Sequence, residues 1–188
     1  LNLETYDEWK DQPDFVGDVM RFLDNVLTDF INRAPESFKH AKYAAMRERS
    51  VGLGVMGFHS FLQKKLIPLE SAISKSWNNK IFKHIQTEVD EASKKLSKER
   101  GACPDAEEYG FKERFSNKTA VAPTASISII CGGASPGVEP VAANSYTHKT
   151  LSGSYNVRNR YLKKVLEKYG KNNDEIWSSI TTNQGSVE

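Results

Sequence analysis

Hydroxyl side chains alternate with small and apolar residues in one short turn of the chain. The turn consists of Thr124, Ala125, Ser126, Ile127 and Ser128, and a glycine-rich run, 131–140, follows it. Backbone N–H groups and hydroxyls that converge in such a turn can bind an anion, because small side chains let a ligand approach the backbone. No Lys or Arg lies within 123–128, so binding would depend on amide dipoles, hydroxyl donors and a helix N-terminus. The pattern indicates a phosphate-binding turn.

The elements on either side would position this turn. Residues 119–123 form a small apolar run that ends at Pro123, which predicts a buried strand followed by a helix. An ordinary strand-to-helix connection with a capping hydroxyl explains the same residues and is the commoner use of this pattern. The residues alone leave both interpretations open.

Apolar residues at helical spacing predict several helices with buried faces. These helices are expected over 14–32, 58–66, 70–100, 156–169 and 174–180. Pro35 would end the first helix and Gly101 the longest. Alternation of Val51, Leu53 and Val55 with glycines predicts a strand at 50–57 that another backbone approaches closely. An acidic solvated loop is expected at 105–110 and an exposed excursion at 144–154.

Composition limits the classes of protein to consider. The chain has 188 residues, 38% of them hydrophobic and 27% charged, with a formal net charge of +2. This predicts one soluble domain over 1–188. No basic block is interleaved with aromatic residues, so we expect no nucleic-acid partner. No apolar run is long enough to cross a bilayer, and the first residues show no signal-peptide pattern. We therefore expect no membrane partner and a cytoplasmic location.

Thiols, histidines and charge clusters outside the turn are expected to serve the structure. Cys103 and Cys131 are 28 positions apart and form no metal-binding motif, so we expect buried or half-buried thiols and no metal. His59 is interpreted as a histidine whose hydrogen bonds are satisfied. The cluster 47–49 is expected to form structural ion pairs, and the basic residues of 94–100 a solvated helix end.

Four ordered stretches resemble one family, the large (α) subunit of ribonucleotide reductase. They are Leu1-Asn2-Leu3, the run Met46 to Val55, the run Glu99 to Pro104, and Pro123 to Ser128 with Gly137-Val138-Glu139-Pro140. The last stretch resembles the loop that holds the substrate diphosphate. The resemblance implies a helix-dominated α/β piece of the family's ten-stranded α/β barrel, from its C-terminal portion.

The chain also departs from that family. The resemblance implies a radical-bearing cysteine flanked by asparagine and glutamate, a pair of reducing cysteines, radical-transfer tyrosines and a cysteine-containing tail, and none of these is present. The family is several times longer, and this chain begins with Leu1. We therefore expect part of a large subunit, with no catalytic residue of its own and no reductase turnover in isolation.

The resemblance further implies the ligand and the partners. Thr124, Ala125, Ser126 and Ile127 would hold a ribonucleoside diphosphate, with Ser128 a weaker candidate. No cofactor is expected in this chain, whereas the full enzyme needs a radical generator that the sequence does not identify. The partners would be the remaining part of the large subunit or a complementary chain, in an oligomer. A non-catalytic nucleotide-binding or phosphate-binding module, or a subunit-assembly module, is the alternative.

Overall fold

The computed structural model describes residues 1–150 and 153–187 and is rich in helices. The N-terminal half contains η1 (Leu3–Thr5), α1 (Tyr6–Trp9), α2 (Phe15–Arg33), η2 (Glu36–Phe38), α3 (Lys39–Glu48), α4 (Phe58–Lys64) and α5 (Ala72–Arg100). The C-terminal half contains α6 (Pro104–Glu108), α7 (Ala125–Ile130), β1 (Ser145–Thr150), β2 (Gly153–Arg158), α8 (Arg160–Lys168) and α9 (Asp174–Thr182). All five helices expected from apolar spacing are present.

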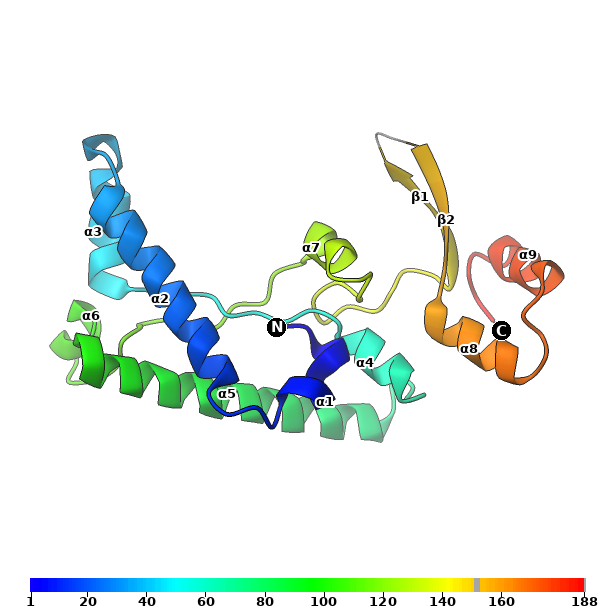
Figure 1. Cartoon of the computed structure of the whole chain (residues 1–188), viewed down its shortest axis with the longest axis horizontal. Coiled ribbons are helices and arrows are strands. Elements are labelled where there is room, and N and C mark those ends of the chain that lie inside the picture. The colour runs from blue at the N-terminus through cyan, green and yellow to red at the C-terminus, as the bar shows by residue number, and fades with distance from the viewer. Residues whose placement is uncertain (151–152, 188) are drawn as a thin grey trace.

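The long helix α5 forms the base of the molecule, and α2 crosses it (Figure 1). The apolar stripe of α5 is buried as expected, through Ile81, Ile85, Val89, Ala92 and Leu96. Val16 and Met20 of α2 belong to the same core. At the start of α5, the Ser74 N–H donates to Ser71 Oγ over 3.1 Å, and Gly101 ends the helix with a φ of +87°. Capping and an apolar stripe therefore explain this helix.

Three extended segments from distant parts of the chain lie side by side above α5. Asn2 pairs with Met56, and Leu53 pairs with Thr119, both in parallel. Gly54 is needed here, because a Cβ atom at this position would lie 2.4 Å from the Ala120 carbonyl oxygen. The close approach expected at 50–57 is therefore confirmed.

The strands expected at 50–57 and 119–123 are reduced to these isolated bridges. The prediction of a buried strand at 119–123 was wrong, since Val121 is 63% exposed and Pro123 is exposed too. No further strand pairs with this segment among the described residues. An apolar run gives a regular buried strand only where a neighbouring backbone completes the ladder.

Two loops expected near the acidic run and after Pro140 contain regular structure instead. Residues 105–108 belong to α6, which Pro104 starts at a position where a missing N–H costs nothing. The excursion at 144–154 is largely an antiparallel hairpin, in which Tyr146 pairs with Val157. Because β2 continues to Arg158, helix α8 starts four residues later than expected, where the Asn159 side chain accepts the Tyr161 N–H over 2.9 Å.

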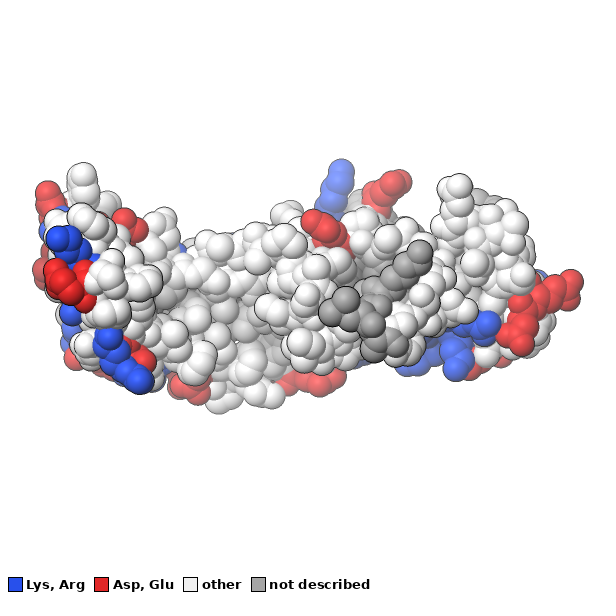
Figure 2. All heavy atoms as spheres, turned by 90° about the horizontal axis from the view of Figure 1, so that it is seen from above, with Lys and Arg blue, Asp and Glu red and all other residues white. Residues whose placement is uncertain are grey.

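Apolar side chains of α2 and α3 remain exposed on one face. Phe22, Val26 and Phe30 of α2 are 63%, 52% and 37% exposed, although the stripe of this helix was expected to be core. Tyr43 and Met46 of α3 are exposed as well. The described residues cover these side chains only in part. Figure 2 shows charged side chains at both ends and near the middle of the molecule, with a largely uncharged stretch between the left end and the middle.

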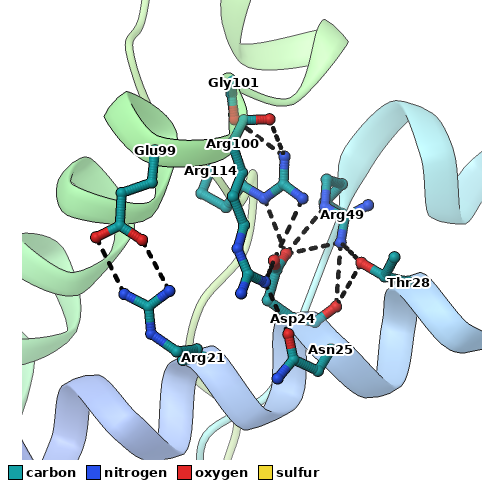
Figure 3. A network of polar contacts seen from close by, with 9 residues as sticks. All are labelled: Arg21, Asp24, Asn25, Thr28, Arg49, Glu99, Arg100, Gly101 and Arg114. Atoms are coloured by element: carbon teal, nitrogen blue, oxygen red, sulfur yellow. Dashed lines mark hydrogen bonds and ion pairs between the residues drawn. The ribbon is translucent and has the colours of Figure 1, made fainter.

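A buried carboxylate joins the segments at one end of the molecule (Figure 3). Asp24 of α2 is fully buried and contacts three arginines. Its oxygens accept from Arg49 Nη2 (2.6 Å), Arg114 Nε (2.8 Å) and Arg100 Nη1 (2.7 Å). These arginines follow α3, precede the third extended segment and end α5, respectively. The structural role expected for the cluster 47–49 is confirmed at Arg49, whereas Arg100 is not part of a merely solvated helix end.

Arginine contacts decide the protonation of this carboxyl group. Burial opposes its ionisation, but the hydrogen bonds from Arg114, Arg100 and Arg49 outweigh burial and hold the pKa of Asp24 below its ordinary value of 3.8. Arg114 also donates to the Arg100 and Gly101 carbonyl oxygens at the end of α5, each over 3.0 Å. The network therefore provides hydrogen-bond donors both to the Asp24 carboxylate and to the carbonyl groups at the C-terminus of α5.

Replacing Asp24 by asparagine should destabilise the fold strongly. D24N leaves the buried Arg49 and Arg114 and the more exposed Arg100 without their anion, and breaking a buried ion pair in this way costs about 3–5 kcal/mol. Chemical unfolding of D24N and of D18N, an exposed carboxylate on the same helix, measures the difference. If the unfolding free energy fell no further in D24N than in D18N, the ion pairs of Asp24 would not stabilise the fold as proposed.

The same carboxylate should make stability depend on pH. Because its pKa is lowered in the folded state, its contribution is present above pH 4 and is lost as the pH falls through the folded pKa. Acid titration of the unfolding free energy should therefore show a decrease below pH 4 that is smaller in D24N, where only carboxylates such as Asp7, Asp90 and Glu99 still have lowered pKa values.

Candidate functional site

The predicted turn forms the start of helix α7, on the side of the extended segments away from α5 (Figure 1). Thr124 precedes the helix and adopts a left-handed conformation with a φ of 52°. Its carbonyl oxygen accepts the Ser128 N–H over 2.8 Å. A non-glycine residue in this conformation needs support from its surroundings. The turn is therefore held in a defined shape rather than left to its intrinsic preference.

The first turn of α7 presents three backbone N–H groups to solvent. The amides of Ala125, Ser126 and Ile127 have no carbonyl partner inside the helix, and no side chain caps them. All three residues are exposed. With the Thr124 and Ser126 hydroxyls nearby in the sequence, this end of the helix offers neutral donors and a positive dipole end. Such an arrangement can bind an anion without a charged side chain.

Ser128 differs from the other residues of the turn. Its side chain is 2% exposed, and its hydroxyl donates to the Ala125 carbonyl oxygen over 3.2 Å. Its own carbonyl oxygen accepts the N–H groups of Gly133 and Ala134 over 3.0 and 3.1 Å. Ser128 thus connects α7 to the glycine-rich run, while the four preceding residues lie at the surface or half-buried.

The glycine-rich run returns to the turn and supports Thr124. The Gly137 N–H donates to Thr124 Oγ1 over 2.8 Å. Gly137 has a φ of +46°, and a Cβ atom there would lie 3.0 Å from the Ala122 carbonyl oxygen. Glycine is needed at this position for both its conformation and the close backbone approach. The contact leaves the Thr124 hydroxyl proton free for another acceptor.

The start of α4 holds the same run through two buried serines. The Gly57 N–H donates to the Ser135 carbonyl oxygen over 2.8 Å. The Ser60 N–H donates to Ser135 Oγ over 3.1 Å, and the Ser135 N–H donates to Ser60 Oγ over 2.9 Å. Ser60 and Ser135 are 2% and 0% exposed. This pair could not be predicted, because nothing in the sequence relates two serines 75 positions apart.

His59 adds a further contact from α4. Its Nδ1 accepts the Val141 N–H over 3.1 Å, so in the neutral ring the proton is on Nε2. Burial lowers the pKa of His59, which favours this neutral form at pH 7. The expectation of a histidine with a satisfied hydrogen bond is confirmed.

The cysteines take no part in this site. Cys103 is buried, as expected, but Cys131 is exposed just after α7, so the interpretation of Cys131 as a packing residue was wrong. Cys131 is the residue at which α7 ends. In the part of the chain that the structure describes, no histidine, cysteine and carboxylate side chains gather into a metal-binding group. Nor does any helix among 1–150 and 153–187 have the length and hydropathy needed to cross a membrane.

Comparison with known proteins relates the chain to one family. The family described as "Ribonucleotide reductase, barrel domain" matches residues 2–113 and 105–188. The ribonucleoside-diphosphate reductase large subunit of Invertebrate iridescent virus 6 is 48% identical over 190 residues, covering all of this chain and 20% of that protein. The large subunit of Invertebrate iridescent virus 3 is 42% identical over 191 residues, covering all of this chain and 30% of that protein.

A solved structure agrees with these sequence matches. The class Id ribonucleotide reductase alpha subunit of Actinobacillus ureae is 37% identical and superposes with a TM-score of 0.89. The match covers all of this chain and 34% of that chain. The 188 residues therefore span about a third or less of the length of these similar proteins.

Replacing Gly137 should loosen the turn. G137A places a Cβ atom against the Ala122 carbonyl oxygen at a positive φ, so we expect a loss of about 1–3 kcal/mol in unfolding free energy. Amide hydrogen exchange should become faster at Ser128 and at position 137. The control is G132A, where φ is +85° but no atom lies within 4 Å of the added Cβ. Equal effects of the two variants would show that the contact with Thr124 does not shape the turn.

Proposed function

The chain belongs to the family of ribonucleotide reductase barrel domains, and on this premise we propose that it is part of a ribonucleoside-diphosphate reductase large subunit. Residues 1–188 would act as one unit, the C-terminal portion of the barrel. In that enzyme it would contribute the loop that holds the diphosphate of the substrate. The product class would be deoxyribonucleotides.

The observation that carries this proposal is the first turn of α7. The N–H groups of Ala125, Ser126 and Ile127 have no partner within the helix and no side-chain cap, and the hydroxyls of Thr124 and Ser126 would extend the donor set. Thr124 Oγ1 already accepts the Gly137 N–H, so its proton is the part available to a phosphate oxygen. Ser128 would support the turn from inside, because its hydroxyl donates to a carbonyl oxygen of the same helix.

Binding at the phosphate serves a reaction elsewhere on the nucleotide. A site that holds the diphosphate fixes the position of the ribose, and this positioning lowers the entropy that the chemical step must lose. The phosphate contacts are the same in the ground state and the transition state, so their direct effect is on substrate affinity. The turn would therefore be a binding element and not a catalytic one.

The reaction would need groups from outside these residues. The family resemblance implies a cysteine radical and reducing cysteines, and neither Cys103 nor Cys131 matches those motifs. A radical generator would be bound elsewhere or supplied by another subunit. The exposed apolar side chains of α2 and α3 would pack against the rest of the large subunit, within an oligomer. A cytoplasmic location is consistent with this role.

Removing the two hydroxyls of the turn should weaken diphosphate binding. T124A combined with S126A deletes two donors, each worth about 1 kcal/mol, so we expect a loss of roughly ten- to a hundredfold in affinity. Calorimetric titration with a ribonucleoside diphosphate measures this in the large subunit that contains the chain. The matched control is T87A, which removes an exposed hydroxyl of α5. Unchanged affinity in the double variant would argue for a simple strand-to-helix connection.

The chain alone should not reduce nucleotides. Without the radical and reducing cysteines, incubation with a ribonucleoside diphosphate and a dithiol should give no deoxynucleotide above background. Chromatographic product analysis checks this, with a complete ribonucleotide reductase as the positive control. Formation of deoxynucleotide by the 188 residues would overturn the assignment of the chemistry to other groups.

A further inference from the structure

We propose that His59 and the Ser60–Ser135 pair are positioning residues that set the affinity of the α7 turn for diphosphate. The inference rests on the proposed function of that turn. None of the three residues belongs to the turn itself. They act through residues 134–141, the end of the glycine-rich run together with Val141, which connect α4 to Thr124.

The first attachment point is Ser135. Its hydroxyl accepts the Ser60 N–H, which lies in the first turn of α4 and lacks a carbonyl partner within that helix. Ser135 thus caps a helix that is distant in sequence, while Ser60 Oγ accepts the Ser135 N–H in return. Both side chains are buried, and a buried amide left without an acceptor is costly. This end of the run therefore has a single strongly favoured position.

The second attachment point is Val141. Its N–H donates to His59 Nδ1, and His59 is the neighbour of Ser60 on α4. The run is consequently fixed to the same helix on both sides of Gly137. Two fixed points six residues apart restrict how far the segment between them can move.

Gly137 transfers this restriction to the turn. Its N–H donates to Thr124 Oγ1 over 2.8 Å, and its backbone lies so near the Ala122 carbonyl oxygen that an added Cβ atom would be 3.0 Å from it. Thr124 in turn sets the left-handed start of α7 and the direction of the free amides. A rigid start lowers the ordering cost of binding, so losing an attachment point should weaken the affinity without removing a ligand contact.

Substitution of His59 tests the inference with a built-in rescue. H59L removes the acceptor at similar size, whereas H59N keeps an oxygen near the position of Nδ1. We expect the KM for a ribonucleoside diphosphate to rise about three- to tenfold in H59L, with a smaller change in kcat. H59N should recover most of the affinity. The measurement uses the large subunit that contains the chain, assembled with its radical-generating partner.

Substitution of Ser135 provides a second, independent variant. S135A leaves the Ser60 N–H without its acceptor, so we expect a similar rise in KM and faster amide exchange at Gly137 and Val141. T87A again serves as the control. Hydrogen exchange reports on the run without ligand, so it remains informative where activity is too low to measure.

The outcomes separate this inference from the proposed function. If the parent protein binds diphosphate and T124A with S126A weakens it, the turn is the site. H59L and S135A with unchanged KM and unchanged exchange would then overturn the positioning role alone. Equal loss in H59L and H59N would also overturn it, because the acceptor would not be the property that matters. If the parent protein does not bind diphosphate, the proposed function fails, and unchanged exchange at Gly137 and Val141 in both variants would additionally overturn the positioning role.

Discussion

One buried carboxylate determines how the helical part of the molecule is assembled. Asp24 contacts Arg49, Arg100 and Arg114 at once, and these residues belong to segments that are far apart in the sequence. A buried charge is tolerated only with partners. Four parts of the chain must therefore meet at Asp24: α2, the residues after α3, the end of α5 and the segment before 116. The contacts of Asp24 therefore fix where the extended segments begin relative to α2, α3 and α5. The position of the α7 turn follows from this, because the turn comes directly after the third extended segment.

A second constraint acts at the other side of the extended segments. Ser60 and Ser135 exchange two hydrogen bonds, and His59 accepts the Val141 N–H. These contacts join α4 to the run that supports Thr124. The contacts of Asp24 determine the position of the extended segments, whereas the contacts of α4 determine the shape of the turn at the start of α7. Under the proposed function, binding at α7 would therefore depend on residues that do not contact the anion.

Most of the helices and the position of the candidate turn could be predicted from the sequence. The features that could not be predicted depend on contacts between distant segments. The helices α2 and α5 follow from local apolar spacing and caps, and residues 124–127 from hydroxyls and small side chains. The strand at 119–123 failed because a strand depends on neighbours outside its own segment. Part of the α2 stripe failed for the same reason, since the described residues leave Phe22, Val26 and Phe30 exposed. The serine pair was missed because its contacts exist only after folding.

The parallel pairing of distant segments has a consequence for the kinetics of folding. Asn2 meets Met56, and Leu53 meets Thr119, so each bridge closes a loop of more than fifty residues. Helices such as α5 form from local contacts on a submicrosecond to microsecond scale, whereas these pairings must first lose the entropy of loop closure. The helices would thus be present before the extended layer is complete. During that interval the backbone around Gly54 would stay unpaired, and it would be open to pairing with another chain as the protein is synthesised.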